Sequence, residues 1–338
     1  MTKTKKHTVI YDTDPGVDDA MALYFALAHP DINLIGITTT FGNVTAEQAA
    51  KNALYLCAIA GRGEIPVTQG VSQPRVKHAE APPDFIHGAD GLGNLTSRYA
   101  TSNTLDPRSS AQFIVDTARQ HPGEVSVVAV GPLGNLARAL ELEPELPALL
   151  RKVVVMGGTA LEPGNVSPVA EANIWNDPHA ADLVFGAGFQ LTMVGLDVTH
   201  RVILPVALFE RIAKHHKQPA TDTLLHAVAF YSNFYSALHP QVAKVHGCFG
   251  HDVLAFLALT QPELFSCESG RVRVATEGLA QGQTILKRTT ADYPQPGWGN
   301  DVPETSVCMQ VEADACIRQI ETVLMSDWLK TKVERQAQ

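Results

Sequence analysis

The sequence lacks the features of disulfide-rich, zinc-binding and membrane proteins. Its five cysteines are an odd number, are scattered along the chain, and form no CxxC pair, which argues against a disulfide framework or a structural zinc site. The longest apolar run, Ala20–Ala28, is far shorter than the roughly 20 residues that cross a bilayer. No apolar leader with a small-residue cleavage site is present, so we expect a cytoplasmic protein with no membrane partner.

Positive charge is also scarce. The net charge is −9, and the one sustained basic run is Lys3-Thr4-Lys5-Lys6, so a nucleic-acid partner is not expected. No Pro/Ser/Gly-rich linker, fixed-period repeat or low-complexity segment divides the chain. With 338 residues, 45% of them hydrophobic, the chain can bury a large core, and we expect one domain over 1–338 with its core at about 8–325.

The most unusual feature of the sequence is a dense group of acids near its start. Four aspartates fall within the eight-residue run Asp12-Thr13-Asp14-Pro15-Gly16-Val17-Asp18-Asp19. The preceding residues Thr8–Tyr11 are β-branched or aromatic and predict a short buried strand. Pro15 and Gly16 end that strand, and Ala20–Ala28 predicts a helix. The acids therefore lie where a strand passes into a helix, which is the place where open α/β sheets bind ligands.

Four crowded carboxylates repel one another, and a helix dipole favours each acid by only about 0.3–1 kcal/mol. Either some of them are protonated or a divalent cation lies among them. The run contains no Cys or His, so its ligands would be hard oxygens that suit Ca²⁺ or Mg²⁺. An EF-hand is not indicated, because Leu23 stands where its twelfth loop position needs Glu.

The order of elements predicts an α/β fold, a mostly parallel central sheet flanked by helices and related to the Rossmann fold. Strands are expected at 8–11, 32–40, 124–130, 153–156 and 190–196, with helices at 44–61, 109–120, from 136 and from 178. The C-terminal part is more helical, at 205–215, 221–238, 251–259 and 313–329, with a small late β element at 263–288 and 306–311. The stretch 70–106 is rich in turn formers and long enough to suggest a functional loop.

Polar side chains gather at the predicted strand ends. They are Asp14, Asp18, Asp19, Asn43, Asn165, Glu171, Asn173 and the pair His251-Asp252. If the strands are parallel, these ends share one edge of the sheet. Carboxylates and carboxamides around a hard cation suit a polyhydroxylated ligand, and such a cation lowers the pKa of water. No Ser or Cys lies on a nucleophile elbow, so a covalent acyl mechanism has no support.

At this level of detail the sequence resembles the inosine-uridine preferring nucleoside hydrolase family. The motifs that carry the resemblance are the acidic run at 12–19, Ile37-Thr38-Thr39-Thr40-Phe41-Gly42-Asn43, Val155-Met156-Gly157-Gly158, Gly164-Asn165 with Ala170-Glu171-Ala172-Asn173, and His251-Asp252. They occur in the family's order and spacing. The resemblance implies a hydrolase that cleaves the N-glycosidic bond of ribonucleosides, and a homodimer or homotetramer.

The resemblance also implies a Ca²⁺ held by Asp14, Asp19, Asp252 and the backbone carbonyl of Val130. Asp14 would be the general base for the water that attacks C1′ of the ribose. The residues expected to bind the ribose are Asp18, Asn43, Asn165, Glu171, Asn173 and the backbone near Met156. The carboxylates among them would stabilise a sugar that develops oxocarbenium character.

On the side of the leaving base, the resemblance implies that His251 protonates the base, with His87, Tyr231 or Tyr235 lining its pocket. Base preference, whether purine or pyrimidine, is not predicted, since it depends on loops at 73–90 and 225–250. One departure from the family is Ala172, where many relatives have Phe, so the wall near the 5′ end of the sugar is expected to differ. Trp175 is a candidate to compensate.

Two alternatives remain open from the sequence. A phosphatase of the haloacid dehalogenase type also places two aspartates after its first strand, but Pro15-Gly16 and the acidic surroundings here disfavour phosphate. A calcium-dependent nucleoside or sugar binder without catalysis would need the cation but not an acid and a base. The presence of both Asp14 and His251 favours the enzyme over the binder.

Overall fold

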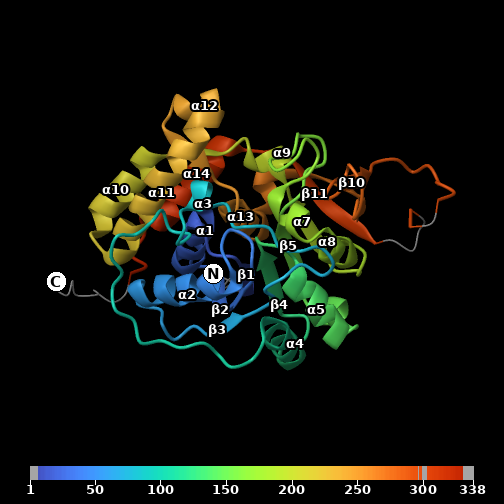
Figure 1. The fold of residues 1–338 in the computed structure, drawn as a ribbon, viewed down its shortest axis with the longest axis horizontal. Helices are drawn as coiled ribbons and strands as arrows, with labels where there is room; N and C mark the ends of the chain where they lie inside the picture. The colour runs from blue at the N-terminus through green and yellow to red at the C-terminus, as the bar shows by residue number, and fades with distance from the viewer. Residues whose placement is uncertain (1–6, 296, 299–302, 330–338) are drawn as a thin grey trace, which may run out of the picture.

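The structure is a computed structural model that describes residues 7–295, 297, 298 and 303–329. Within the described residues its centre is a nine-stranded sheet of order β10-β9-β11-β6-β5-β4-β1-β2-β3, covered by helices on both faces (Figure 1). The strands from β3 through β1 to β11 are all parallel to their neighbours, and β9 and β10 are antiparallel. The predicted α/β class with a mostly parallel sheet is confirmed.

The strands of this sheet are β1 (His7–Thr13), β2 (Ile32–Thr39), β3 (Val67–Gln69), β4 (Val125–Ala129), β5 (Lys152–Met156), β6 (Leu191–Val194), β9 (Phe265–Val274), β10 (Thr284–Lys287) and β11 (Glu304–Val311). A second, two-stranded sheet pairs β7 (Ile203–Pro205) with β8 (Gly247–Phe249).

The helices before residue 200 are α1 (Val17–Ala28), α2 (Ala46–Ile59), α3 (Asp84–His87), α4 (Ser110–Gln120), α5 (Gly134–Leu142), α6 (Leu146–Leu149), α7 (Ala172–Asn176), α8 (Pro178–Phe185) and α9 (Leu196–Thr199). Those that follow are α10 (Val206–His216), α11 (Pro219–Leu238), α12 (Pro240–Ala243), α13 (Val253–Thr260) and α14 (Ala313–Leu324), with a 3₁₀ turn at Pro262–Leu264.

Successive side chains of the central strands point to opposite faces, and each face has its own core. In β5, Val154 joins the cluster beneath α1, α10, α11, α13 and α14, whereas Val153 and Val155 join the cluster beneath α4, α5 and α8. Figure 1 shows these two groups of helices on opposite sides of the sheet. Because both faces are covered, the central strands β4 and β6 are buried along their whole length, as expected for a parallel sheet.

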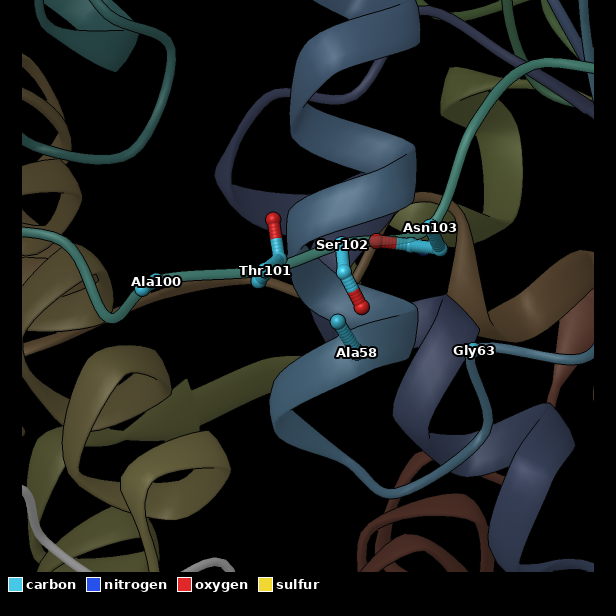
Figure 2. Close-up of a pocket in the computed structure, with 6 residues that line it drawn as sticks. All are labelled: Ala58, Gly63, Ala100, Thr101, Ser102 and Asn103. Atoms are coloured by element: carbon cyan, nitrogen blue, oxygen red, sulfur yellow. The ribbon is translucent and has the colours of Figure 1, made fainter.

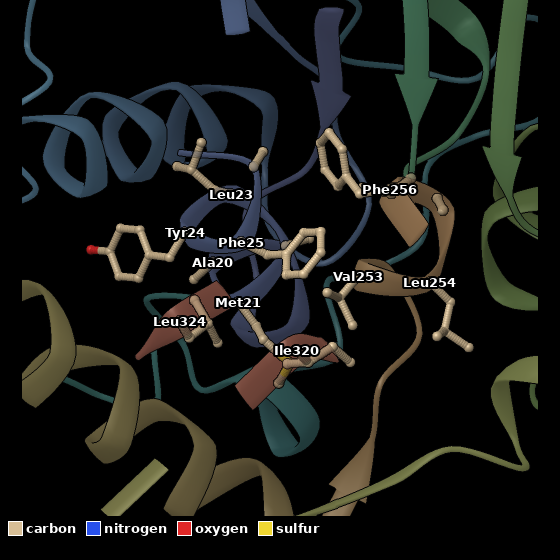
Figure 3. Close-up of a cluster of buried hydrophobic side chains, with 14 of the residues drawn as sticks. Ala20, Met21, Leu23, Tyr24, Phe25, Val253, Leu254, Phe256, Ile320 and Leu324 are labelled. Carbon is tan, nitrogen blue, oxygen red and sulfur yellow. The ribbon is translucent and has the colours of Figure 1, made fainter. Parts of the chain in front are cut away.

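The larger core locks the first helix in place. Figure 3 shows Met21 and Phe25 of α1 packed among Val253 and Phe256 of α13 and Ile320 of α14. All five side chains are fully buried. Because α1 and α13 begin at the same edge of the sheet, this packing fixes the positions of the polar residues at both helix starts.

The direction of winding reverses at β1. From β1 the chain adds β2 and β3 on one side, then crosses to add β4, β5 and β6 on the other. The crossovers of the two halves run away from each other at this point, which leaves a crevice at the carboxyl ends of β1 and β4. The acidic run leaves β1 there.

The expected late β element is present as β9, β10 and β11, and the pairing of β11 with β6 brings it into the main sheet. Two features were not expected from the sequence. The strand β3 has only three residues, too few to produce a periodic pattern. The pairing of β7 with β8 joins segments more than 40 residues apart, which no local signal predicts. The basic run at 3–6 lies outside the described residues.

Within the described residues, no helix is both long and apolar enough to cross a membrane.

The packing between α1 and α13 makes a prediction about stability. Phe256→Ala should lower the free energy of unfolding by about 3–5 kcal/mol, because it leaves a cavity where the ring now contacts Tyr11 at 5.1 Å between centroids. Leu279→Ala is the control, since that side chain is fully exposed and should change stability by less than about 0.5 kcal/mol. Urea unfolding followed by circular dichroism measures both. A small loss for Phe256→Ala would contradict the packing.

Candidate active site

Asp19 is the anchor of the turn that follows β1. It is the third residue of α1, and its carboxylate folds back over the turn to accept from the Gly16 backbone N–H at 2.9 Å. The Thr13 hydroxyl donates to its other oxygen at 2.5 Å. The Gly16 N–H is a backbone donor that a helix start leaves free, and the Thr13 hydroxyl adds a side-chain donor, so the local sequence itself orients the Asp19 carboxylate.

Asp14 is held from the neighbouring strand. The Asn43 backbone N–H donates to Asp14 Oδ2 at 2.7 Å, and the Asn43 side chain donates to Asp19 Oδ2 at 2.9 Å. Gly42 and Gly131 let the ends of β2 and β4 approach, since a β-carbon at either position would lie within 2.5 Å of an Asp14 carboxylate oxygen. Asn43 therefore holds two carboxylates together, and the two glycines leave room for one of them.

The acids converge on one buried point. One carboxylate oxygen from each of Asp18, Asp19 and Asp252 lies within 4.8 Å of the other two. In the part of the chain that the structure describes, Asp14 Oδ1, Asp18 Oδ1 and Asp252 Oδ2 are buried oxygens without a hydrogen-bond partner. Buried acceptors are seldom left unpaired, so the cluster has the donor set of a cation site.

Burial and mutual repulsion disfavour the charged forms. Burial first, and the charge of Asp19 second, raise the pKa of Asp18 to about 7 and raise the pKa of Asp14. Burial followed by the charges of Asp18, Asp19 and Asp14 raises the pKa of Asp252. The cluster thus needs a compensating positive charge to be ionised at neutral pH, and hard oxygen donors suit Ca²⁺ or Mg²⁺.

The start of α7, in the segment that follows β5, supplies a carboxylate and an amide, Glu171 and Asn173. Glu171 caps α7 by accepting from the backbone N–H groups of Asn173 at 2.9 Å and Ile174 at 3.2 Å, and it also accepts from Gly158 N at 2.8 Å. Burial, partly offset by those N–H groups, raises the pKa of Glu171 to about 7. Its charge acts on Asp252, which places the Glu171 carboxylate near the acidic cluster.

Asn173 connects two of the parallel strands. Its amide nitrogen donates to the carbonyls of Val130 at 2.7 Å and Met156 at 3.1 Å, which follow β4 and end β5. With the amide hydrogens engaged, its carbonyl oxygen is left to accept from a ligand hydroxyl. The structure thus brings Val130 and Met156 beside Asn173, as the shared sheet edge predicts.

Asn165 differs from the other predicted ribose residues. It is exposed, and its side-chain oxygen accepts from the Ala172 backbone N–H at 3.0 Å, so it holds the loop onto α7. Trp175, the candidate to compensate for Ala172, donates to Glu80 at 3.1 Å and lies 4.4 Å from the Lys77 ammonium. These contacts fix the irregular stretch around residue 80 against α7.

A row of hydroxyl and imidazole groups adjoins the acids, since His87 Nδ1 lies 3.9 Å from Asp18 Oδ1. The Tyr231 hydroxyl is 3.3 Å from that of Tyr235, which is 3.1 Å from His251 Nε2. His251 Nδ1 is in turn 2.9 Å from the Thr199 hydroxyl. The buried His87 accepts from Val17 N at 3.2 Å, and its ring lies 5.1 Å from that of Tyr231. All four predicted base-side residues are therefore neighbours.

The imidazoles in this row are neutral. Burial lowers the pKa of His87 to about 3, and burial together with the nearby His200, His87 and His239 lowers the pKa of His251. A neutral imidazole donates from one nitrogen and accepts at the other, so His251 has a proton to give at Nε2 only in the tautomer that carries it there.

Thr13 and Thr199 were not singled out in the sequence. Thr199 ends α9, which follows β6 directly, so it stands at the same edge of the sheet as the other strand-end residues. The rule that selected polar residues after each strand would have found it, had hydroxyl side chains been included with acids and amides. Thr13 gives no signal of its own, because it lies between Asp12 and Asp14 and nothing in the sequence separates its role from that of the two acids.

A surface hollow lies elsewhere. Figure 2 shows its lining of small and uncharged residues, which are Ala58, Gly63, Ala100, Thr101, Ser102 and Asn103. It has a volume of about 440 Å³, but it lies at the C-terminal end of α2, whereas the acids lie near the start of that helix. With no ionisable side chain in its lining, it offers nothing for acid–base or metal chemistry.

Comparisons with known proteins identify the family of the chain. Residues 9–318 match the family model of the inosine-uridine preferring nucleoside hydrolases. A probable uridine nucleosidase 1 of Oryza sativa subsp. japonica is 40% identical over 306 residues, covering 87% of this chain and 93% of that protein.

Solved structures are similar over nearly the whole chain. A plant nucleoside hydrolase superposes with a TM-score of 0.88 at 33% identity, covering 95% of this chain and 99% of that one. A purine-preferring ribonucleoside hydrolase from Gardnerella vaginalis has a TM-score of 0.87 at 32% identity, covering 96% and 99%.

The matched segment contains the acidic cluster, Glu171, Asn173 and the row that ends at His251. The chain therefore belongs to the inosine-uridine preferring nucleoside hydrolase family and is a hydrolase acting on N-glycosyl bonds.

Proposed function

We propose that this protein hydrolyses the N-glycosidic bond of ribonucleosides in a reaction that depends on Ca²⁺. The observation that carries the proposal is the buried group of Asp18, Asp19 and Asp252, whose oxygens lie within 4.8 Å of one another, with the buried Asp14 interacting with all three. Three carboxylate oxygens, from Asp14, Asp18 and Asp252, lack a hydrogen-bond partner among the described residues. Hard oxygen ligands of high charge suit Ca²⁺, and the released sugar and base follow from the family's chemistry.

Asp14, Asp19, Asp252 and the Val130 carbonyl are the proposed ligands of the cation. When bound, Ca²⁺ supplies positive charge that offsets the repulsion among the acids and lowers the pKa of a nearby water. The Val130 carbonyl already accepts from Asn173, and its second lone pair leaves it able to serve as a ligand.

Asp14 is suited to act as the general base. One of its oxygens is fixed by the Asn43 N–H at 2.7 Å, while the other has no partner among the described residues. The fixed oxygen sets the orientation of the carboxylate, so the free one can take the proton of a water that attacks C1′.

The sugar is proposed to lie between Asp18 and the side formed by Glu171 and Asn173. The carboxylates accept hydrogen bonds from the ribose hydroxyls. Their negative charge also stabilises the positive charge that develops on the sugar ring. Asn43 acts by holding Asp14 and Asp19, and Met156 through its carbonyl beside Asn173. Asn165 remains a predicted ribose contact, though its side chain here supports the loop.

The leaving base is proposed to meet His87, Tyr231, Tyr235 and His251. His251 Nε2 gives its proton to the leaving base, and the proton that Asp14 takes from the attacking water returns through solvent to His251 after the products leave. The Thr199 hydroxyl, 2.9 Å from Nδ1, orients the ring. Relatives bear names that point to uridine and to purine nucleosides, so we propose uridine as the first substrate and leave purines as a comparison. A cytoplasmic location and a homodimer or homotetramer stay predictions.

Replacing the proposed base tests the mechanism. Asp14→Asn should reduce kcat by about 10²–10⁴-fold at saturating Ca²⁺, because the amide cannot take a proton. Nucleoside affinity, measured by calorimetry, should fall by less than about tenfold, since Asp18 and Asn173 still hold the sugar. Glu47→Gln, an exposed carboxylate of α2, is the control. Equal losses in turnover and affinity would contradict the general-base role.

The role of His251 can be tested by comparing the hydrolysis rates of substrates whose leaving groups differ in their need for a proton. His251→Ala should slow the hydrolysis of uridine and inosine by about 10²-fold or more, because their bases leave poorly without a proton. p-Nitrophenyl riboside should slow by less than about tenfold, since its leaving group needs no acid. The exposed His215 of α10, changed to Ala, serves as the control. Similar losses on all substrates would remove His251 as the acid.

Thermal unfolding tests the cation site without turnover. Ca²⁺ at about one hundred times its Kd should stabilise the protein by roughly 2.7 kcal/mol, and Asp252→Asn should abolish most of that gain. In EDTA the variant should be at least as stable as the wild type, because one of the repelling charges is gone. Asp314→Asn, on the exposed side of α14, should keep the full Ca²⁺ response.

A further inference from the structure

Two cysteines lie side by side on neighbouring strands, at the edge of the sheet opposite the carboxylates. Cys267 of β9 and Cys308 of β11 are direct partners in the antiparallel ladder, and their sulfur atoms are 3.3 Å apart. Directly opposed residues of such a ladder have Cα atoms about 4.5–5.5 Å apart, which lies inside the roughly 4.4–6.8 Å that a disulfide needs. The pair can therefore be bridged by side-chain rotation alone.

The two thiols differ in access. Cys267 is exposed to solvent, whereas Cys308 is 1% exposed. The other three cysteines, Cys57, Cys248 and Cys316, are fully buried. A small molecule in solution can therefore reach the sulfur of Cys267, whereas the sulfur of Cys308 is covered by the protein.

The surroundings favour reactivity at Cys267. Both sulfurs line a small cleft of about 70 Å³ together with Lys152, Thr192, Ser306 and Phe265. A hydrogen bond from Cys308, another from Ser306 and the charge of Lys152 outweigh burial and lower the pKa of Cys267 to about 6. By contrast, burial raises the pKa of both Cys57 and Cys316 to about 12. Thiolate character and access thus coincide at one of the five cysteines.

We propose that Cys267 and Cys308 form a thiol–disulfide exchange site that reacts with small-molecule disulfides and closes to a cross-strand disulfide. Cys267 is the attacking sulfur and Cys308 the resolving one. This site is separate from the nucleoside chemistry. Lys152 begins β5 and Thr192 lies near the start of β6, at the amino ends of parallel strands, whereas Asp14, Asp18 and Asp19 follow the carboxyl end of the parallel strand β1.

The reaction balances in two exchanges. The Cys267 thiolate attacks one sulfur of a disulfide RSSR, forms a mixed disulfide and releases RS⁻. Cys308 then gives its proton to the solvent or to RS⁻ and attacks the Cys267 sulfur, which breaks the mixed bond and releases a second RS⁻. The protein loses two electrons and two protons, and RSSR is reduced to two RSH.

Oxidised glutathione is the probe, and intact-mass spectrometry follows the reaction with the full chain. The wild type should lose two hydrogens per chain and retain no adduct, and peptide mapping should locate the bond between Cys267 and Cys308. Cys308→Ser should instead retain one glutathionyl group at Cys267, because the resolving thiol is missing. Cys267→Ser should retain none, and Cys316→Ser, a buried control, should behave as the wild type does.

Several results would overturn the proposal. They are a wild type that does not react, a wild type that keeps a stable adduct, and a Cys308→Ser variant without an adduct. If Cys308→Ser fails to fold, Cys308→Ala takes its place, and the bond mapped in the wild type already decides the matter. Nucleoside hydrolysis should be unchanged within about twofold after oxidation and after reduction by dithiothreitol, so this test stands apart from that of the proposed function.

Discussion

The structure depends on the burial of four carboxylates at a single point. Burying one ionised group without compensation is costly, and the pKa values of Asp14, Asp18, Asp19 and Asp252 are all raised by burial. Hydrogen-bond donors such as the backbone and side chain of Asn43 hold the carboxylates together. The packing of α1 against α13 fixes the helix starts from which three of them extend. A protein would not retain so unfavourable a cluster for stability, so the cluster indicates a bound cation.

The fold explains how distant segments reach this point. Reversal of the winding at β1 opens the crevice, and the parallel strands deliver Asp14, Val130 and Met156 to its edge. Asn173 then joins the ends of β4 and β5 through its amide. The row from Tyr231 to His251 adjoins the same point, since His87 packs against Tyr231 and lies 3.9 Å from Asp18 Oδ1. Carboxylates and neutral hydroxyl and imidazole groups thus meet in one buried site.

Much of this site was predictable because its signals are local. Four aspartates in eight residues and amides after strands are visible in the sequence, and parallel strands bring them together. Side-chain function within the site is less predictable, since Asn165 has the right position but is exposed and supports Ala172. Contacts between distant segments, such as Cys267 with Cys308, leave no periodic trace, because they depend on strand register set by the whole sheet.

The most direct test of the account is release of reducing sugar from uridine and inosine before and after EDTA, followed by added Ca²⁺ or Mg²⁺. The account predicts that release stops in EDTA and returns with Ca²⁺, because the acidic cluster needs that charge to orient water and sugar. Release that continues unchanged in EDTA would contradict it. No release with Ca²⁺ bound would instead identify a binder.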